Sequence, residues 1–391
     1  MASAGRAKLK MPRSIIETLF VELRTVLENR SPVSLFADGA PVLIYGAGNV
    51  GKEVFNILTR QGILVAGFLD RQSQPGAVWS GVPIHPPDDL KLSAAQRQRT
   101  HVVLGIFNAF VDIPPIVALL KRLGYGRVTN FLELHDQFAG ELGDRFWLTA
   151  RAYYLGQEQL AMAGYEIWSD DVSRDLYAKT LKFRFSLDYE VLPAPERDNQ
   201  YFVKELPTWP TPLRLVDCGA FDGDTLRHLA AAQIPVAAIA AFEPDPANFV
   251  KLAQFVRTNA AEMPDQVCLF PCGVGSATTQ VRFSSGQGTG SHASASGDTV
   301  IQCVSLDEAL PGFRPNLIKM DIEGAESDAL RGARQLIAEH RPALAICLYH
   351  CPDHLWQIPL LVRQLTGGGG KYFLRAHCFS GFDSVLYWLP D

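Results

Sequence analysis

Three carboxylates stand close together in the stretch LIKMDIEGAE, which runs from residue 317 to residue 326. Asp321 closes an apolar run that has the composition of a buried strand, and Glu323 follows two residues later. An ionised carboxylate at the end of a buried strand needs a partner, which makes Asp321 a candidate site residue. Glu326 has a simpler explanation as a helix-start residue, because the positive end of a helix dipole favours negative charge.

Acidic residues and glycines also end other apolar runs in the same half of the chain. The stretch VDCGAFDGDT ends a run with Asp217, and Gly219 after it allows a sharp turn and a close approach to a ligand. The stretch AFEPDP presents Glu243 at the next tip, where an acidic residue can accept both hydroxyls of a ribose. CGVG at 272–275 offers small side chains that leave a slot for a flat ring. A cationic ligand with a ribose and an amine fits these acidic tips, which describes S-adenosylmethionine.

The order of the predicted elements places these tips at one edge of a sheet. Strands and helices alternate over 34–140 and again over 213–391, whereas 141–212 is mostly helical and 1–33 is a tail with a helix. Such alternation predicts parallel sheets, whose ligands bind beyond the carboxyl ends of the strands. We therefore predict an α/β protein of two Rossmann-like domains joined by a helical connector, the C-terminal domain a seven-stranded methyltransferase sheet.

The predicted strands of the C-terminal domain end in a hairpin. An inserted strand pair at 280–283 and 301–306 flanks a Ser/Gly-rich loop that could serve as a lid. The strands that we expect in the main sheet are 213–219, 236–244, 266–275, 316–321, 343–350, 371–378 and 384–390.

The region from about 213 to 391 resembles the FkbM-type S-adenosylmethionine-dependent methyltransferases. The resemblance rests on VDCGAFDGDT, FEPDP, SLDEAL, LIKMDIEGAE and LYHCPDHLWQIP in this order, with DNQYF before them and YFLRAH and SVLYW after them. It implies O-methyl transfer to a hydroxyl of a sugar, glycan or secondary metabolite. Many members carry a Glu close before the His that ends the fifth strand, and this chain departs from them with Leu348 and Tyr349. The cofactor-binding residues that we predict are Asp217, Gly219, Ala220, Phe221, Asp224, Thr225, Glu243, Pro244, Gly273, Val274, Asp321 and Glu323.

Methyl transfer to a hydroxyl gains from a base that takes the proton. His350 ends the predicted fifth strand, so Asp321 and His350 are the catalytic candidates. A lone histidine is more often a satisfied structural residue, and that alternative stays open for His350. A divalent metal on Asp321 also stays open, but no second pair of carboxylates fixes one, and we predict no metal site. The residues predicted for the substrate pocket are Ser291, Asp353, Arg375 and His377.

The first domain carries a glycine motif of its own. In GAGNVG, Gly46, Gly48 and Gly51 have the G-x-G-x-x-G spacing between a strand and a helix, and Asp70 ends the next strand. These four residues predict a second nucleotide site for NAD or a nucleotide sugar. GFLD and GVPIHPPDDL resemble Rossmann-like domains of nucleotide-sugar-modifying proteins. An empty site, in a fold retained for packing or partner binding, is the other interpretation of this motif. The alternative function is an NAD- or nucleotide-sugar-binding protein in which the methyltransferase-like domain is subordinate or non-catalytic.

Composition limits the classes of protein. The chain has 391 residues and a net charge of −5, which gives no indication of a nucleic-acid partner. No apolar run reaches the roughly 18 residues of a membrane span, and the basic start lacks the pattern of a secretory signal. Seven cysteines, an odd number mostly in apolar runs, favour a reducing cytoplasm over disulfides or zinc. The sequence names neither the acceptor nor the oligomeric state, and a homo-oligomer stays open.

Overall fold

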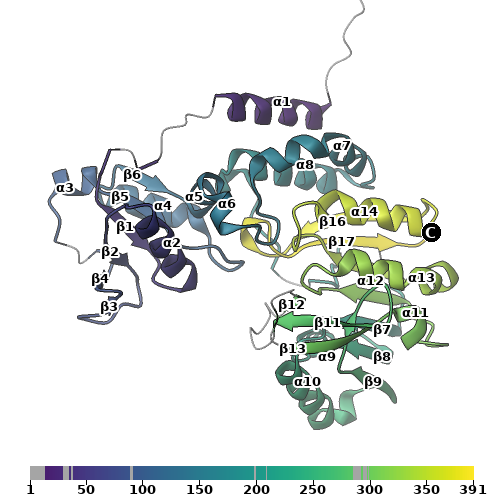
Figure 1. Cartoon of the computed structure of the whole chain (residues 1–391). Helices are drawn as coiled ribbons and strands as arrows, with labels where there is room; N and C mark the ends of the chain where they lie inside the picture. Colours follow the sequence, from purple (N-terminus) through teal and green to yellow (C-terminus); the bar gives the residue numbers. More distant parts are fainter. Residues whose placement is uncertain are drawn as a thin grey trace, which may run out of the picture.

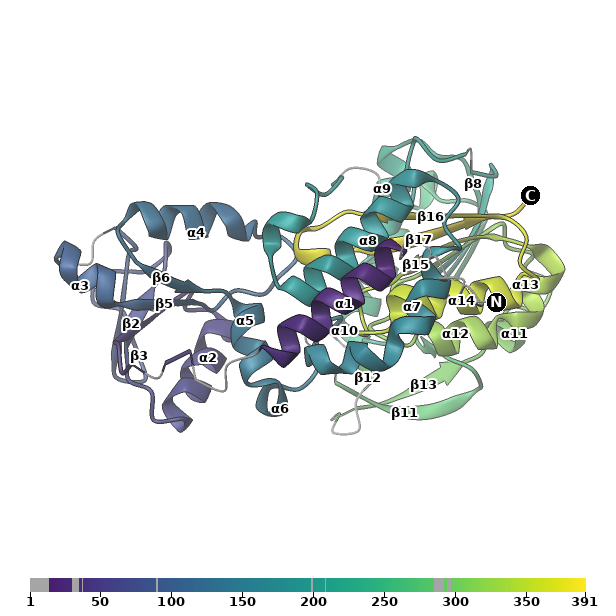
Figure 2. The ribbon, with the colours of Figure 1, turned by 90° about the horizontal axis from the view of Figure 1, so that it is seen from above.

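The computed structural model describes residues 14–29, 35–36, 38–88, 91–197, 200–207, 209–284, 292–293, 297 and 299–391. Two α/β sheets lie side by side in it, with a layer of helices over the second (Figures 1 and 2). The predicted fold class is therefore confirmed.

The first sheet has six strands in the order β3-β4-β2-β1-β5-β6. Its strands from β4 to β6 are parallel, and only the short β3 pairs antiparallel, with β4. The hairpin of β3 and β4 and the strand β6 were not among the sequence predictions. The strands are β1 (Val42–Tyr45), β2 (Val65–Leu69), β3 (Val78–Trp79), β4 (Val82–His85), β5 (His101–Leu104) and β6 (Arg127–Thr129). The helices are α2 (Asn49–Arg60), α3 (Ala94–Arg99), α4 (Ile113–Arg122) and α5 (Phe131–Gln137).

The second sheet has seven strands in the order β16-β17-β15-β14-β7-β8-β9. All neighbours pair in parallel except β17, which is antiparallel to β15 and β16 and forms the predicted terminal hairpin. The strands are β7 (Leu213–Cys218), β8 (Val236–Phe242), β9 (Gln266–Phe270), β14 (Leu317–Met320), β15 (Ala343–Cys347), β16 (Lys371–Ala376) and β17 (Ser384–Leu389). Their helices and helical turns are α9 (Asp224–Ala231), α10 (Pro246–Thr258), η3 (Ala260–Glu262), α11 (Leu306–Ala309), α12 (Glu326–Gly332), α13 (Arg334–His340), α14 (His354–Leu365) and η5 (Phe379–Gly381).

A small separate sheet lies beside the second one, in the order β10-β13-β11-β12. It contains β10 (Gly273–Val274), β11 (Thr279–Ser284), β12 (His292–Ala293) and β13 (Thr299–Val304). The predicted inserted pair is confirmed by the antiparallel β11 and β13. The prediction that 266–275 is one core strand is wrong, because β9 ends at Phe270 and the chain then pairs with β13. Most of the Ser/Gly-rich loop, including Ser291, lies outside the described residues.

The helical layer connects the two α/β units. It consists of α1 (Ile15–Glu28), α6 (Ala139–Leu142), η1 (Arg151–Gln157), α7 (Glu158–Tyr165), α8 (Asp171–Ser186) and η2 (Tyr189–Val191). Asp170 caps α8 by accepting from the N–H of Ser173 at 2.8 Å. The segment 145–157 does not form one continuous helix, because Phe146 has a φ of 50°, which no right-handed helix accommodates.

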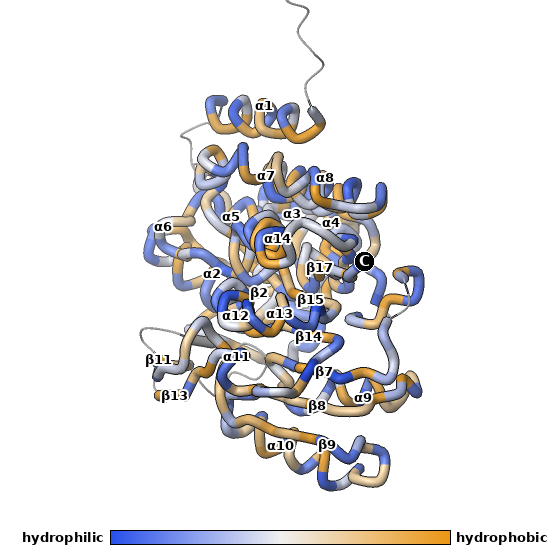
Figure 3. The backbone as a smooth tube through the Cα atoms, turned by 90° about the vertical axis from the view of Figure 1, so that its right-hand side faces the viewer, coloured by the Kyte–Doolittle hydropathy of each residue, from blue (hydrophilic) through white to orange (hydrophobic). Residues whose placement is uncertain are grey.

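The helix α1 packs against α7 and α8 of the helical layer rather than on the first sheet. Its hydrophobic residues recur at helical spacing, as the alternating colours along α1 in Figure 3 show. Ile16, Leu19 and Phe20 are buried in the same core as Tyr177 of α8 and Trp356 of α14. Helix α1 thus packs beside the second α/β unit, although it precedes the first unit in the sequence.

Candidate active site

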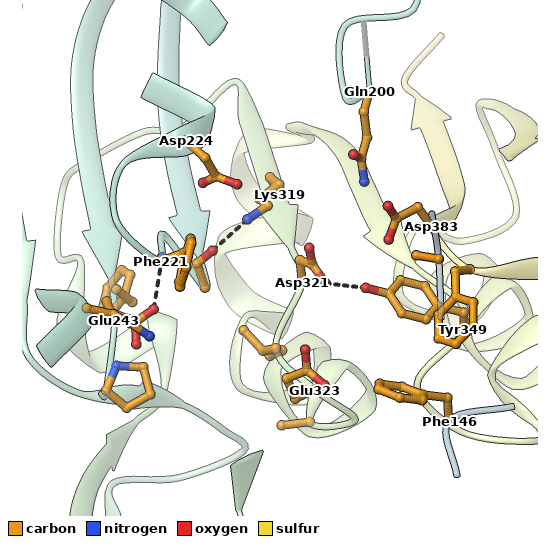
Figure 4. A pocket seen from close by; sticks show the side chains of 18 of the residues that line it. Phe146, Gln200, Phe221, Asp224, Glu243, Lys319, Asp321, Glu323, Tyr349 and Asp383 are labelled. Carbon is orange, nitrogen blue, oxygen red and sulfur yellow. Dashed lines mark hydrogen bonds between the residues drawn. The ribbon is translucent and has the colours of Figure 1, made fainter. Parts of the chain in front are cut away.

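One cavity of about 610 Å³ lies at the carboxyl ends of the central strands of the second sheet. The segments after β7, β8 and β14 contribute Gly219, Glu243 and Asp321 to its wall. These segments lie side by side because β7 pairs in parallel with β8 on one edge and with β14 on the other. Figure 4 shows Glu243 at one side, Asp321 in the middle, and Tyr349 at the other side. The two carboxylates therefore share one cavity.

The cavity brings together most of the predicted cofactor residues. Those that line it are Gly219, Phe221, Asp224, Glu243, Pro244, Gly273, Val274, Asp321 and Glu323. The other three predicted residues are buried and do not form its wall: Asp217 lies in β7, Ala220 in the loop after it, and Thr225 at the start of α9. Their position suits a role in holding the loop.

Asp217 faces a buried lysine that the sequence reasoning missed. The register between β7 and β14 pairs Asp217 with Lys319, whose Nζ lies 3.0 Å from the carboxylate and donates to the carbonyl of Gly219 at 2.6 Å. Burial alone would lower the pKa of Lys319, but the charges of Asp217 and Asp321 outweigh it and raise that pKa. A lysine inside an apolar strand needs such a partner, so this signal was available in LIKMD.

The loop after β7 depends on a glycine for its close approach to β14. Gly219 has a φ of 82°, and a Cβ there would lie 2.0 Å from the carbonyl oxygen of Asp321. A side chain would force the two strand ends apart, and they are the ends that form the cavity.

Glu243 is fixed by the backbone around it. One carboxylate oxygen accepts from the N–H of Phe221 at 2.9 Å and the other from the N–H of Asp245 at 2.8 Å. Burial raises the pKa of Glu243 to about 7, even though these two hydrogen bonds oppose the shift. Each oxygen keeps a further lone pair, so the group can accept two more hydrogen bonds from a ligand in the cavity.

Asp321 is held by two tyrosines from distant parts of the chain. Its carboxylate accepts from the hydroxyl of Tyr201 at 2.8 Å and from that of Tyr349 at 3.3 Å. Burial, followed by the charge of Asp321, raises the pKa of both hydroxyls well above the ordinary value, so both keep their protons and act as donors. This arrangement orients Asp321 toward the cavity (Figure 4).

His350 lies behind the cavity rather than in its wall, which does not suit the predicted general base. Its Nδ1 lies 2.7 Å from Glu326, and its Nε2 lies 3.3 Å from Asp321 and 3.7 Å from Glu323. Burial opposes the charged ring, but the Glu326 charge and hydrogen bond outweigh it, with smaller contributions from Glu323 and Asp321, and raise the pKa of His350 to about 10. Glu326 begins α12 as predicted, but it is fully buried and is the counter-ion of His350.

Replacing His350 by glutamine should destabilise the fold by about 3–5 kcal/mol near pH 6, because a buried ion pair loses one partner. A histidine whose folded pKa is raised stabilises fully below its unfolded pKa of 6.5, and this contribution is lost as the pH rises through about 10. The difference in the free energy of unfolding between the wild type and His350→Gln should therefore decrease between about pH 7 and pH 10.

Chemical unfolding at pH 6, 8 and 10 measures this difference. His340→Gln is the matched control, since His340 lies 4.0 Å from Glu339 at a partly exposed position. If His350→Gln lost the same free energy of unfolding at all three pH values, this would contradict the positive charge that we assign to the His350 ring.

Two further carboxylates lie on the Asp321 side of the cavity. Burial raises the pKa of Glu323 to about 7, although the charge of His350 opposes the shift. Asp383, in the turn before β17, was missed by the sequence reasoning, and burial followed by the charge of Asp321 raises its pKa. This side of the cavity is therefore acidic, with part of its charge suppressed near neutral pH.

The three predicted substrate residues that the structure describes do not lie together. His377 lines the cavity, where it contacts the carbonyl of Glu196 and the hydroxyl of Tyr387, each at 2.7 Å. Arg375 pairs instead with Asp170 at 2.8 Å and Glu205 at 3.0 Å, toward the helical layer. Asp353 precedes α14 and accepts from Tyr153, and Ser291 lies outside the described residues. Arg375 and Asp353 are therefore not placed for contact with a ligand in this cavity.

The glycine motif of the first domain forms the predicted turn between β1 and α2. Asp70 accepts from the N–H of Ala47 at 2.8 Å, which repeats the contact of Glu243 with Phe221 in the second domain. Packing alone requires Gly51, because a Cβ there would lie 1.9 Å from the carbonyl oxygen of Gly46. Gly46, Gly48, Gly51 and Asp70 are not in the wall of the cavity described above.

Two features are absent from the described part of the chain. No group of three or more His, Cys, Asp or Glu side chains there is arranged to hold a metal ion. No described helix is both long and apolar enough to cross a membrane.

A seven-stranded sheet with one antiparallel strand and a cavity at its carboxyl edge defines a Rossmann-like methyltransferase fold. Residues 217–377 match the family model described as the methyltransferase FkbM domain. The chain therefore contains an FkbM-type methyltransferase domain.

Comparison with one solved structure supports the same fold for nearly the whole chain. The methyltransferase FkbM from Methylobacillus flagellatus KT superposes with a TM-score of 0.78 and 21% identity, over 96% of this chain and 99% of that one. Fibrillarin of Aeropyrum pernix, solved in complex with natively bound S-adenosyl-L-methionine, superposes with a TM-score of 0.31 and 13% identity. That match covers 48% of this chain and 70% of fibrillarin. No curated protein matches the chain. Since the first structure covers both α/β units and the connector, their arrangement is common to the two chains.

Proposed function

We propose that this protein is an S-adenosylmethionine-dependent O-methyltransferase that acts on a hydroxyl of a sugar, glycan or secondary metabolite. The observation that carries the proposal is the single cavity shared by Glu243, the Gly219 loop and Asp321. Its volume of about 610 Å³ lies within the usual range of small-molecule sites and leaves space for a cofactor and a small acceptor. The unpaired cysteines are compatible with the cytoplasmic location that we also propose.

The residues of the cavity fit the proposed cofactor. Glu243 has free lone pairs for two ribose hydroxyls, and the segment from Gly219 to Phe221 allows backbone contact with the ligand. Asp224 and Asp321 provide the negative potential that favours a cationic centre. When bound, S-adenosylmethionine would supply an electrophilic methyl group on a positively charged sulfur.

The remaining task of the protein is to orient the acceptor and move its proton. Asp321 is fixed by Tyr201 and Tyr349, so it can accept a hydrogen bond from an acceptor hydroxyl and take the proton as that oxygen forms its new bond. Positioning alone can supply up to about 7–11 kcal/mol in well-oriented cases. His350 acts through Asp321 as a neighbouring positive charge and not as a base.

Ligand titration of the purified full-length chain tests the proposal. S-adenosylhomocysteine, the product form of the cofactor, should stabilise the fold by about 2.7 kcal/mol at a hundred times its Kd. The alternative, in which the first domain binds NAD or a nucleotide sugar and the methyltransferase domain is subordinate, predicts this stabilisation for NAD⁺ or UDP-glucose instead. Thermal unfolding and calorimetry with the three ligands separate the two outcomes, and no response to S-adenosylhomocysteine would refute the proposed function.

A further inference from the structure

The cavity is not built by the methyltransferase domain alone. The segment after β5 of the first sheet contributes Phe107, Asn108, Ala109 and Phe110 to its wall, and Phe146 comes from the segment after α6. The carboxyl edge of the first sheet therefore faces the carboxyl edge of the second across one space. In Figures 1 and 2 the turn between β16 and β17 reaches toward the first α/β unit.

Contacts between the two units hold this wall in place. The carbonyl of Ala109 accepts from the N–H of Phe379 at 3.0 Å, which ties the first domain to the turn of the terminal hairpin. The centroid of the Phe382 ring lies 5.0 Å from the centroid of the Phe107 ring and 5.2 Å from that of the Phe146 ring. Aromatic pairs at these distances are favourable, so the wall is a packed interface and not a chance approach of two loops.

A side-chain cap shapes the end of the segment. Asn108 accepts from the N–H groups of Phe110 at 2.9 Å and Val111 at 3.1 Å, which fixes a tight turn. This turn leaves Phe110 77% exposed while it lines the cavity. A large aromatic side chain is thus presented at the cavity, where a ligand can cover it.

The charges on this side indicate which acceptors fit. Asp321, Glu323 and Asp383 are acidic, whereas His377 is buried with its pKa lowered. The guanidinium of Arg197 lies 4.6 Å from the centre of the Phe379 ring. Carboxylates accept hydrogen bonds from hydroxyls and repel phosphates, and aromatic rings pack against the apolar face of a ring.

The other cation of the cavity is engaged elsewhere. Lys319 is paired with Asp217 at 3.0 Å and bonded to the carbonyl of Gly219, on the cofactor side. Among the described residues, Arg197 is therefore the cation in the wall on the acceptor side, and the charged His350 lies buried behind Asp321 and Glu323. Burial suppresses part of the charge of Glu323 and Asp383 near neutral pH. This wall thus offers a phosphate little accessible positive charge and offers hydroxyl groups three carboxyl groups as partners.

We propose that the segment Phe107–Phe110 of the first domain, with Phe146, forms one wall of the acceptor site and selects an uncharged, hydroxyl-bearing ring such as an unphosphorylated sugar. This inference rests on the proposed function and names its substrate class. It also gives the first domain a role that requires no nucleotide of its own.

Saturation-transfer NMR on the full-length chain with saturating S-adenosylhomocysteine tests the wall. The probes are methyl glucoside and glucose 6-phosphate. We expect a signal from methyl glucoside that exceeds the signal from glucose 6-phosphate, and we expect Phe110→Ala to weaken glucoside binding by about fivefold. The matched control is Leu64→Ala, in the same domain, where Leu64 is 75% exposed and away from the cavity.

The outcomes are separable from failure of the proposed function. Calorimetry with S-adenosylhomocysteine on the same samples should give the same Kd for the wild type and for both variants. If S-adenosylhomocysteine did not bind to the wild type, the methyltransferase proposal itself would be refuted. If the cofactor product binds but Phe110→Ala behaves like Leu64→Ala, the wall is not an acceptor site. A stronger signal from glucose 6-phosphate than from methyl glucoside, or no signal from methyl glucoside, would overturn the proposal that the acceptor is an uncharged sugar ring.

Discussion

Replacing Asp321 by asparagine should lower the rate of methyl transfer by about 10²–10⁴-fold, the range that a positioned base contributes. Asparagine keeps the shape of the side chain, and its oxygen can still accept from Tyr201 or Tyr349. It cannot take a proton from an acceptor hydroxyl. The affinity for S-adenosylhomocysteine should change little, because Glu243 and the Gly219 loop remain intact. Single-turnover transfer from labelled S-adenosylmethionine, with calorimetry on the same samples, measures both quantities.

The control for this variant is Asp328→Asn, at an exposed position on α12 where the carboxylate pairs only with Arg331 on the surface. Glu323 is the competing candidate for the base, because burial raises its pKa to about 7 and it lines the same side of the cavity. Should Asp321→Asn retain most of the turnover while Glu323→Gln loses it, the proton transfer would belong to Glu323. A large loss of cofactor affinity in Asp321→Asn would remove it from the chemistry and place it in binding.

The strands around the cavity could be predicted because each is a short apolar run that ends in polar residues. Parallel strands of a buried sheet need hydrophobic residues on both faces, so runs such as LIKM stand out from amphipathic helices. The acidic tip that follows each run then had to lie at one edge, since parallel strands end on the same side. For this reason the sequence alone predicts that Glu243 and Asp321 belong to one site.

The partners of these tips could not be predicted, because they come from remote parts of the chain. Tyr201 lies 120 residues before Asp321, and Phe107 and Phe146 belong to segments with no sequence signal for a site. No local sequence pattern encodes which surfaces of two domains face each other. The contribution of the first domain to the wall therefore appeared only in the structure.

The position of His350 shows a second limit of strand-end reasoning. Successive residues of an extended chain point to opposite sides, so of two neighbours at a strand end only one can face a given cavity. After β15, Tyr349 faces the cavity and His350 points to the buried Glu326. Tyr349, at the position where this chain departs from the resembling family, is one of the two hydroxyl donors to Asp321. The alternation along the chain thus places Tyr349, and not His350, in the wall of the cavity.

Replacing Glu243 by glutamine should weaken the binding of S-adenosylhomocysteine by about 10–100-fold, because hydrogen bonds to a charged group contribute about 1.5–3 kcal/mol. Glutamine retains one acceptor oxygen, but its NH₂ group would face a backbone N–H that now donates to the carboxylate. Unfolding of the ligand-free variant separates the cost to the fold from the loss of binding. Calorimetry of S-adenosylhomocysteine then gives the effect on affinity.

The chain provides its own comparison for this variant. Asp70 makes the same contact with the N–H of Ala47 in the first domain, so Asp70→Asn removes an equivalent carboxylate from the other glycine loop. If the second domain binds the cofactor, only Glu243→Gln weakens S-adenosylhomocysteine, and Asp70→Asn leaves its Kd unchanged. Equal losses in both variants would mean that a general disturbance of the fold, and not a ribose contact of Glu243, accounts for the effect. A loss confined to Asp70→Asn would move the nucleotide to the first domain, and the acidic tips of the second sheet would then need another explanation.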